Sequence, residues 1–372
     1  MKYRKLGRSK ESVPLIGQGC MGVGGELSAD VTQDTQQIDA LRLGIELGMT
    51  LIDTAEVYGS GHSEELVGRA VRGIRKKVFI STKFSPENNG YEAVLRAAEG
   101  SLRRLGTDYI DLYQVHWPNP VIPIEEAMRA LHKLIRDGKV LHMGLSNFSV
   151  PEMKAARLTV QGSDIVSNQV EYNLFDRFTE QRILPYCVNE SITVLAYSPL
   201  DKGRFSVGDS LLQTIAHRYG KTPSQIALSW LIRQPQVVVI PKASNPAHVR
   251  DNAAAADFEL SVEDAAEIEK AFSAEPLRVP VDEISVSVQG EGNRKVYQTL
   301  EQALHNEYHF TPSPKELADD ILKGEPIKPV RLVLVEAATH RYDLIEGRIR
   351  YWAWVIAYGG VRPIPALIRQ SR

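Results

Sequence analysis

The sequence has few cysteines, no long apolar run and almost no net charge. Cys20 and Cys187 are the only cysteines among 372 residues, so no cysteine cluster can hold zinc or an iron–sulfur centre. No apolar run approaches the roughly 20 residues that span a bilayer, and none follows the basic start as a signal peptide would require. We therefore predict a soluble, cytoplasmic protein without a metal site, whose redox cofactor would have to be organic.

The composition limits partners and sets the number of domains. A formal net charge of −2 gives no general attraction to phosphate backbones, so charge does not support nucleic-acid binding. A hydrophobic content of 43% and a charged content of 24% are ordinary for a globular protein. The length exceeds the roughly 250 residues of one α/β barrel, so we expect a barrel and a small second domain. The oligomeric state stays open.

Short, β-rich apolar runs alternate with helical segments over the first three quarters of the chain. This alternation predicts repeated βα units around a parallel sheet. Several runs are almost entirely apolar, as expected of strands buried on both faces. We predict a (β/α)8 TIM barrel over residues 1–272. Its eight candidate strands are Leu15–Gly19, Leu51–Asp53, Val78–Lys83, Asp111–His116, Met143–Ser146, Ile165–Val170, Thr193–Tyr197 and Val237–Pro241.

The segments between these strands have the periodicity of helices. Gly48, Gly106 and Gly138 stand where helix C-termini would need a left-handed residue. Ser261 is placed to cap a closing helix, Val262–Phe272. Apolar residues recur three and four apart in the other predicted helices, which are Asp39–Leu47, Ser63–Val71, Tyr91–Leu105, Ile124–Asp137, Pro151–Leu158 and Pro223–Arg233.

The pattern changes after Phe272. Residues 273–280 contain two prolines and predict a linker. The residues 281–372 can bury a modest core of their own, so we predict a separate α+β domain there. Its expected elements are helices around Leu300–Asn306, Pro314–Lys323 and Tyr351–Tyr358, and a strand at Val330–Val335.

Four polar residues lie at the predicted C-terminal ends of barrel strands or just beyond them. Asp53, Lys83 and His116 each end a strand, and Tyr58 lies five residues past Asp53. Because these ends face one mouth of an α/β barrel, we expect the four side chains to converge there.

The chemistry of these four residues is coherent. A phenol donates its proton near neutral pH only if the phenolate is stabilised, and Lys83 can supply the cation. Asp53 would keep that lysine charged, and His116 could polarise a substrate carbonyl or share the proton. This arrangement suits reduction of C=O to CH–OH. Side chains do not provide hydride, so a nicotinamide or flavin cofactor is required.

Several segments resemble the aldo-keto reductase family, in its order and spacing, over about residues 1–272. The Asp/Tyr motif is LIDTAEVYGSGHSEELVGRAV, the lysine strand is VFISTKF, the histidine strand is DLYQVHWP, and the nicotinamide-side motifs are GLSNFS, NQVEYN and YSPL. The resemblance implies an NADP(H)-dependent enzyme that reduces an aldehyde or ketone. It makes Tyr58 the general acid and Asp53, Lys83 and His116 its partners.

The resemblance also implies residues that hold NADP(H). His248 stands where members often carry an arginine, so the preference for NADPH over NADH stays open, although Arg250 can compensate. Met21 stands where many relatives have a substrate-pocket tryptophan, which leaves the pocket shape open. The implied cofactor residues are Ser146, Asn147 and Gln169 at the carboxamide, Tyr197 on the nicotinamide ring, Ser198 and Leu200 along the pyrophosphate, Lys242 and Ser244 near the 2′-phosphate, and Asn252 on adenine.

The segment YDLIEGRIRYWAWVIAYGGVRPIPALIR resembles the ParB/sulfiredoxin superfamily, in which a glycine–basic motif opens a helix and cradles nucleotide phosphates. The resemblance implies a nucleotide phosphate site at Gly347, Arg348 and Arg350. The alternative is that these arginines are solvated or paired within the domain. We expect a regulatory, nucleotide-sensing or interaction role.

Two activities of that superfamily are not expected here. Arg348 occupies the position of the sulfiredoxin cysteine, and no cysteine follows Cys187, so peroxiredoxin repair is not predicted. No residues remain for a helix-turn-helix module, so no DNA binding is predicted. Trp352 and Trp354 are expected to pack in the domain core or on its face against the barrel.

Two alternatives to the reductase stay open. The barrel could be an NADPH-binding redox sensor or scaffold whose C-terminal domain recruits a partner. It could also bind a flavin, which would colour the purified protein yellow. The intact set of four polar residues favours the reductase.

Overall fold

The structure is a computed structural model that describes residues 1–26, 28–119, 121–160, 164–201, 210–272, 276–286, 297–308, 310, 312–335 and 340–369. The chain divides into two compact units, unit 1 (Met1–Ser273) and unit 2 (Ala274–Arg372). The division falls in the predicted linker 273–280, whose residues 273–275 lie outside the described part. None of the helices in the described ranges combines the length and the apolar character that a membrane crossing needs.

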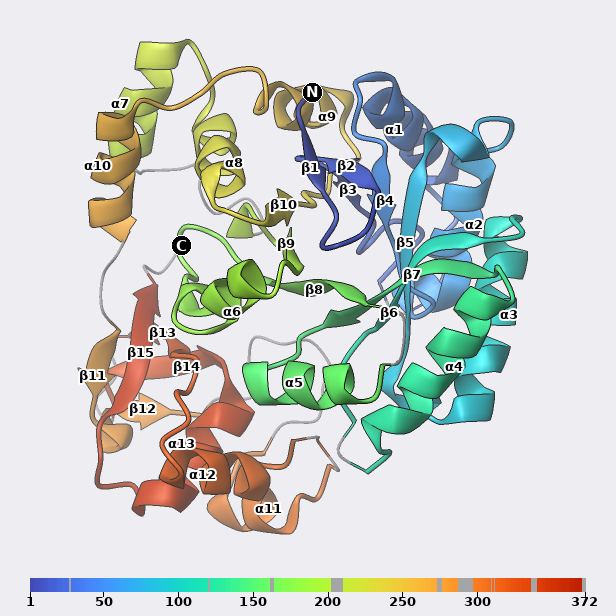
Figure 1. The fold of residues 1–372 in the computed structure, drawn as a ribbon. Coiled ribbons are helices and arrows are strands. Elements are labelled where there is room, and N and C mark those ends of the chain that lie inside the picture. Colours follow the sequence, from blue (N-terminus) through green and yellow to red (C-terminus); the bar gives the residue numbers. More distant parts are fainter. Residues whose placement is uncertain are drawn as a thin grey trace. The chain divides into compact units, whose positions relative to one another are not determined.

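Unit 1 contains the predicted (β/α)8 barrel. Its eight strands form one sheet of neighbouring parallel strands in the order β10-β9-β8-β7-β6-β5-β4-β3. A parallel bridge between Ile16 and Val239 joins the two ends of that order, so the sheet closes on itself (Figure 1). The strands are β3 (Gln18–Gly19), β4 (Leu51–Asp53), β5 (Phe79–Phe84), β6 (Ile110–Val115), β7 (Val140–Ser146), β8 (Ile165–Glu171), β9 (Thr193–Tyr197) and β10 (Val237–Val239).

Helices cover the outside of this sheet (Figure 1). Gly48, Gly106 and Gly138 have φ of 91°, 63° and 72°, which confirms the predicted left-handed helix ends. The described helices of unit 1 include those predicted and three that the periodicity did not reveal, α6, α7 and α9. They are α1 (Asp34–Glu46), α2 (His62–Ala70), α3 (Tyr91–Leu105), α4 (Ile124–Arg136), α5 (Val150–Leu158), α6 (Ile183–Asn189), α7 (Ser210–Tyr219), α8 (Pro223–Arg233), α9 (Pro246–Ala254) and α10 (Val262–Phe272).

A hairpin that the sequence analysis missed packs against the starts of the barrel strands. β1 (Tyr3–Lys5) pairs antiparallel with β2 (Ser12–Pro14). Val13 of β2 and Leu6, which follows β1, are fully buried in one apolar cluster with residues of the barrel strands, including Leu51. Because Leu51 begins β4, this cluster fills the N-terminal end of the barrel and leaves polar side chains at the other end.

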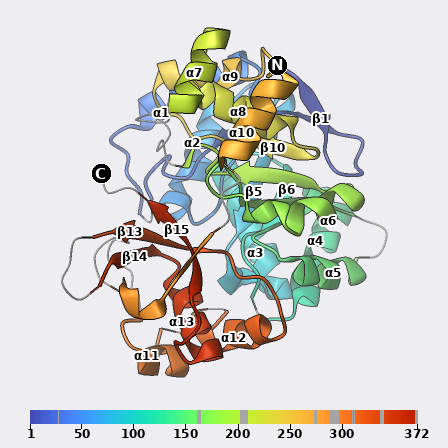
Figure 2. The same ribbon diagram turned by 90° about the vertical axis from the view of Figure 1, so that its left-hand side faces the viewer.

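Unit 2 is an α+β unit with its own core. Its five-stranded sheet has the order β11-β15-β13-β14-β12, and its three described α-helices lie on one side of the sheet (Figure 2). Trp352 and Trp354 are 9% and 5% exposed, and their indole N–H groups donate to the carbonyls of Tyr297 and Arg362, so both pack in the core of unit 2 as expected. The elements are β11 (Leu277–Val279), β12 (Ile284–Ser285), β13 (Val330–Leu334), β14 (Tyr342–Glu346), β15 (Ile364–Arg369), α11 (Leu300–His305), α12 (Pro314–Leu322) and α13 (Arg348–Tyr358).

Candidate active site

Three of the four predicted polar residues meet at the C-terminal ends of β4 and β5 and in the loop after β4. The Lys83 Nζ lies 2.7 Å from Asp53 Oδ2 and 3.4 Å from the Tyr58 hydroxyl oxygen. The same Nζ donates to the carbonyl oxygen of Thr54 at 2.7 Å. Lys83 is 0% exposed and Asp53 is 2% exposed, so this ammonium is held entirely by protein groups.

The loop after β4 turns back to bring Tyr58 over Lys83. Gly59, Ser60 and Gly61 follow Tyr58 with φ of 55°, 53° and 96°. A side chain at Gly59 would be strained, and its Cβ would also lie 2.3 Å from the carbonyl oxygen of Gly24. The loop therefore depends on glycine at this position to place the phenol.

His116 completes the group from the end of β6. Its ring stands edge-on to Tyr58, with ring centroids 5.8 Å apart and an interplanar angle of 79°. Burial, together with the nearby Lys83 cation, lowers the pKa of His116 to about 3. The imidazole is therefore neutral at physiological pH and can donate an N–H hydrogen bond.

The protonation states of Lys83 and Tyr58 follow from their surroundings. Burial acts to lower the pKa of Lys83, but the Asp53 carboxylate and the hydrogen bonds of Lys83 to Asp53 and Tyr58 outweigh it, and the pKa is raised. Burial raises the pKa of Tyr58; Lys83 opposes this rise, and Asp53 and Cys20 add to it. At neutral pH the lysine is charged and the phenol keeps its proton.

A layer of buried polar side chains below the mouth holds the second oxygen of Asp53. Asp53 Oδ1 accepts hydrogen bonds from Ser81 Oγ and Gln169 Nε2, both at 2.8 Å. Gln114 Nε2 donates to Ser81 Oγ at 2.9 Å and lies 3.5 Å from Asp53 Oδ1. The carboxylate is thus oriented with Oδ2 toward Lys83.

Ser81 and Gln114 were not predicted as site residues, although their positions in the sequence give a signal. Each is a polar residue inside a predicted strand, two positions before Lys83 and His116 respectively. Since alternate residues of a strand point to the same side, these positions share the inward face of the barrel with the strand-end residues.

The residues predicted to bind the carboxamide are linked to each other beside this group. Ser146 Oγ donates to the Gln169 carbonyl at 3.1 Å and accepts from Asn147 Nδ2 at 3.0 Å. Asn147 Nδ2 also donates to the His116 carbonyl at 3.1 Å, and Asn147 Oδ1 accepts from the Tyr197 hydroxyl at 3.0 Å. Asn147 has φ of 65°, an uncommon left-handed conformation for a non-glycine residue.

The other predicted cofactor residues lie on the segments after β9 and β10. The Ser198 carbonyl accepts from Asn173 Nδ2 at 3.1 Å, and Leu200 packs against the core. Lys242 is exposed, the Ser244 carbonyl accepts from Gln36 Nε2 at 3.4 Å, and Asn252 is 4% exposed on α9. Hydroxyl and amide groups suit a carboxamide, and an exposed ammonium after the last barrel strand suits a phosphate, so the donor set fits NADP(H).

Three large apolar side chains are exposed on the loops at this end of the barrel. Met21, Val57 and Trp117 are 57%, 38% and 47% exposed, on the loops after β3, β4 and β6. Met21 and Val57 lie on the first two loops, and Trp117 directly follows His116. The mouth therefore offers apolar surface for the carbon part of a substrate.

Neither cysteine of the chain is poised for chemistry. Cys20 and Cys187 are both free and buried. Burial raises the pKa of each thiol, so neither forms a thiolate readily at neutral pH. Among the residues that the structure describes, no three His, Cys, Asp or Glu side chains gather as a metal site would need.

The predicted phosphate-binding segment of unit 2 opens α13. Gly347 has φ of 99° and precedes the helix. Arg348 is 4% exposed. Arg350 Nη1 donates to the carbonyls of Lys328 and Pro329 at 3.0 and 2.8 Å, and its Nη2 donates to Glu346 at 3.4 Å. These contacts favour the paired alternative for Arg350, because its guanidinium already has partners within the unit.

Comparison with known proteins identifies the family. The aldo/keto reductase family matches residues 15–272. Methylglyoxal reductase YeaE of Escherichia coli is 40% identical over 275 residues, covering 73% of this chain and 95% of the relative. Aldo-keto reductase YhdN of Bacillus subtilis is 34% identical over 276 residues, covering 63% of this chain and 82% of the relative.

Solved structures of aldo-keto reductases are also similar to this chain. An aldo-keto reductase from Klebsiella pneumoniae in complex with NADPH is 39% identical, with a TM-score of 0.68 over 73% of this chain and 96% of that chain. The thermostable aldo-keto reductase Tm1743 has a TM-score of 0.70 at 39% identity over 73% of this chain and 99% of that chain. Through residues 15–272 and the barrel that they form, this chain belongs to the aldo/keto reductase family.

Proposed function

We propose that the barrel is an NADP(H)-dependent reductase of aldehydes or ketones in which Tyr58 protonates the substrate oxygen. NADPH supplies the hydride that adds to the carbonyl carbon. The observation that carries the proposal is the contact of the Tyr58 hydroxyl with a buried, charged Lys83 at 3.4 Å. A cytoplasmic location stays a prediction.

In the proposed reaction the substrate oxygen lies between Tyr58 and His116. The neutral His116 donates an N–H hydrogen bond to that oxygen and polarises the carbonyl bond. As negative charge develops on the oxygen, the Tyr58 hydroxyl transfers its proton to it. Lys83 stabilises the phenolate that remains, and Asp53 keeps Lys83 charged until the phenolate regains a proton from solvent.

The remaining predicted residues would hold the cofactor. Ser146, Asn147 and Gln169 would bind the carboxamide, and the Tyr197 ring would stack on the nicotinamide. The hydrogen bond from Tyr197 to Asn147 supports this assignment, because it ties the stacking ring to the amide-binding group. Ser198 and Leu200 would lie along the pyrophosphate, and Lys242, Ser244 and Asn252 would bind the adenosine end.

The substrate class follows from the mouth and from the relatives. Exposed Met21, Val57 and Trp117 favour a carbonyl compound with an apolar part. One relative is a methylglyoxal reductase and another a glyoxal reductase, so small α-oxoaldehydes belong in the first substrate panel.

The test is oxidation of NADPH with a panel of aldehydes, by the wild-type chain and by Tyr58→Phe. The phenylalanine keeps the ring beside His116 and removes only the acid, so kcat should fall by about 10²–10⁴-fold. NADPH affinity, measured by fluorescence titration, should stay close to wild type. Equal turnover by the two proteins would rule out Tyr58 as the acid, and NADPH binding without turnover of any aldehyde would favour the redox-sensing alternative.

For unit 2 we keep a second, separate proposal, that the start of α13 binds a nucleotide phosphate. The left-handed Gly347 at the start of an 11-residue helix supports it, since backbone N–H groups at a helix start attract anions. Gly347 and Arg348 would be the contacts, and Arg350 would hold the segment in place. Isothermal titration of the full chain with ATP, CTP and polyphosphate tests this proposal, and no heat of binding from any of the three would end it.

A further inference from the structure

A single arginine beneath the mouth contacts both ends of the loop that carries Tyr58. Arg104, on α3, donates from Nε to Glu64 Oε2 at 2.6 Å, and its Nη2 lies 4.0 Å from Glu56 Oε2. Glu56 lies two residues before Tyr58, and Glu64 lies six residues after it. Arg104 therefore ties the entry and the exit of this loop to one guanidinium.

The same two carboxylates are bonded to residues on either side of Lys83. Glu64 Oε1 accepts from Thr82 Oγ1 at 2.6 Å, and Glu56 Oε1 accepts from the Ser85 backbone N–H at 2.7 Å. Thr82 immediately precedes Lys83, and Ser85 follows it by two. The loop of Tyr58 and the strand of Lys83 are thus connected through partners of Arg104.

Glycines make the space that this arginine occupies. A Cβ at Gly61, in the Tyr58 loop, would lie 2.6 Å from Arg104 Cδ, and a Cβ at Gly100 would lie 3.1 Å from its Nη1. A Cβ at Gly68 on α2 would lie 2.4 Å from the Leu105 carbonyl, so α2 and α3 approach closely here. The absence of side chains at Gly61 and Gly100 therefore leaves room for the Arg104 side chain between α3 and the Tyr58 loop.

The contact with Glu64 is buried and costly to break. Glu64 is 0% exposed, and burial raises the pKa of its carboxyl group against the opposing effect of Arg104 and Thr82. Removing one partner of a buried ion pair leaves an uncompensated charge, which rearranges its surroundings. The first segments that can rearrange are those bonded to Glu64 and Glu56, which flank Tyr58 and Lys83.

We infer that Arg104 is a positioning residue that holds the Tyr58 oxygen against the Lys83 ammonium. It does not touch the reacting atoms. The inference rests on the proposed function, because it assigns Arg104 a task only if Tyr58 transfers a proton. Displacement of the phenol by a fraction of the 3.4 Å contact would slow that transfer, while the cofactor residues from β7 onward would stay in place.

A matched control exists at the other end of the barrel. Arg75 Nη2 pairs with Asp111 Oδ2 at 2.6 Å, and burial raises the pKa of Asp111, as it does for Glu64. Asp111 lies near the start of β6 and Arg75 precedes β5, so this pair contacts the strand starts rather than the mouth. Arg75→Met removes a comparable ion pair without touching the Tyr58 loop.

The experiment compares Arg104→Met, Arg104→Lys and Arg75→Met in the full chain. For Arg104→Met we expect kcat for aldehyde reduction to fall by about 10–100-fold, with the Kd for NADPH within about twofold of wild type. The ratio of kcat in H2O to kcat in D2O should rise, because proton transfer from a misplaced phenol becomes rate-limiting. Arg104→Lys keeps the charge but loses the two-sided fork, so its kcat should be intermediate.

Both methionine variants should lower the unfolding temperature, because each loses an ion pair. Arg75→Met should leave kcat and the solvent isotope ratio unchanged. If the two methionine variants lose stability alike and neither changes kcat or the isotope ratio, Arg104 is only structural and the inference is wrong. If Arg104→Met does not fold, Glu56→Gln takes its place and should change kcat and the solvent isotope ratio in the same direction by a smaller amount. Unchanged values of both in Glu56→Gln would also overturn the inference. A wild type inactive on every aldehyde, or a fully active Tyr58→Phe, would instead refute the proposed function.

Discussion

The barrel mouth and the start of α13 both gather basic groups, but they use them differently. At the mouth, Lys83 is neutralised on one side by Asp53 and lies beside the hydroxyl of Tyr58 on the other. At the start of α13, Arg350 donates to the carbonyls of Lys328 and Pro329 and to Glu346. The Lys83 cation therefore lies next to a hydroxyl group at the mouth, whereas the Arg350 cation is bound by groups of its own unit.

The two cations differ because their partners come from different parts of the chain. The mouth collects side chains from the loop after β4 and from the ends of β5 and β6, which only barrel closure brings together. The arginines of α13 lie on one turn of one helix and find carbonyl and carboxylate partners nearby. A basic motif thus says little about binding until its hydrogen-bond partners are known.

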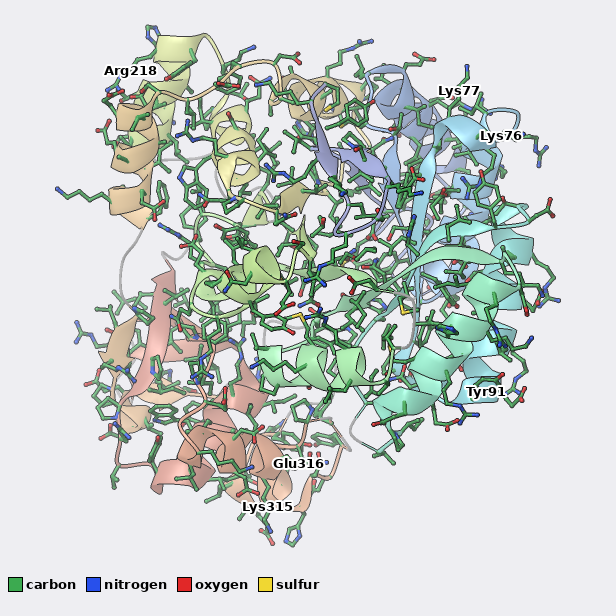
Figure 3. All side chains as sticks on the ribbon, viewed as in Figure 1. Lys76, Lys77, Tyr91, Arg218, Lys315 and Glu316 are labelled. Carbon is green, nitrogen blue, oxygen red and sulfur yellow. The ribbon has the colours of Figure 1, made fainter. Side chains whose placement is uncertain are left out.

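Among the changes that test this difference between the two cations, Lys83→Met is expected to have the largest effect. Loss of the ammonium removes the group that stabilises the phenolate, so kcat should fall by about 10²–10³-fold, or about 3–4 kcal/mol. Lys77→Met is the control, since Lys77 is an exposed lysine on the outer surface (Figure 3). Steady-state kinetics at saturating NADPH measures both, and a Lys83 variant as active as the Lys77 variant would contradict the mechanism.

A smaller effect, on stability rather than rate, is expected from Arg350→Met. The variant loses hydrogen bonds to two backbone carbonyls, which should lower the free energy of unfolding of unit 2 by about 1–3 kcal/mol. Urea denaturation followed by Trp fluorescence measures it, with Lys323→Met at an exposed lysine as the control. If Arg350→Met leaves the stability unchanged and weakens nucleotide binding, then Arg350 is a phosphate ligand.

The smallest expected effect is that of pH on the rate of carbonyl reduction, because His116 should not titrate near neutral pH. Because the pKa of His116 is lowered to about 3, its imidazole stays neutral as the pH rises through the ordinary histidine value of 6.5. The rate of carbonyl reduction should therefore show no inflection near that pH at saturating substrate. The profile should be repeated with His62→Gln, because the pKa of His62 is raised by Glu65 and Asp34 despite its partial burial. An inflection present in both proteins would contradict this prediction, because a group other than His62 would then titrate in that range.

Much of unit 1 could be predicted because its signals are local. The eight strand positions follow from β-rich apolar runs, and the helix ends follow from glycines such as Gly106, which needs φ of 63°. The hairpin β1–β2 was missed because its strands are only three residues long and depend on packing of Leu6 and Val13 against the barrel. In unit 2, β14 and β15 were missed for a related reason, since each is defined by pairing with β13.

The groups around the candidate site were less predictable. Positions at strand ends point to Asp53, Lys83 and His116, and the family resemblance adds the cofactor residues. Ser81 and Gln114 lie inside strands, where polar residues are easily taken as exposed. Arg104 lies in a helical segment, where an arginine is normally solvated, and only the packing of α3 against the Tyr58 loop shows its two carboxylate partners.

Local patterns along the chain were enough to predict the barrel, the order of its strands and the residue types that could carry proton transfer, because periodicity and strand ends are properties of neighbouring residues. The folded structure was needed to show which oxygen of Asp53 contacts Lys83, that burial keeps His116 neutral, and that Arg104 and Arg350 have partners within the fold. These outcomes depend on burial and on distances between residues far apart in the chain, and closure of the sheet creates both.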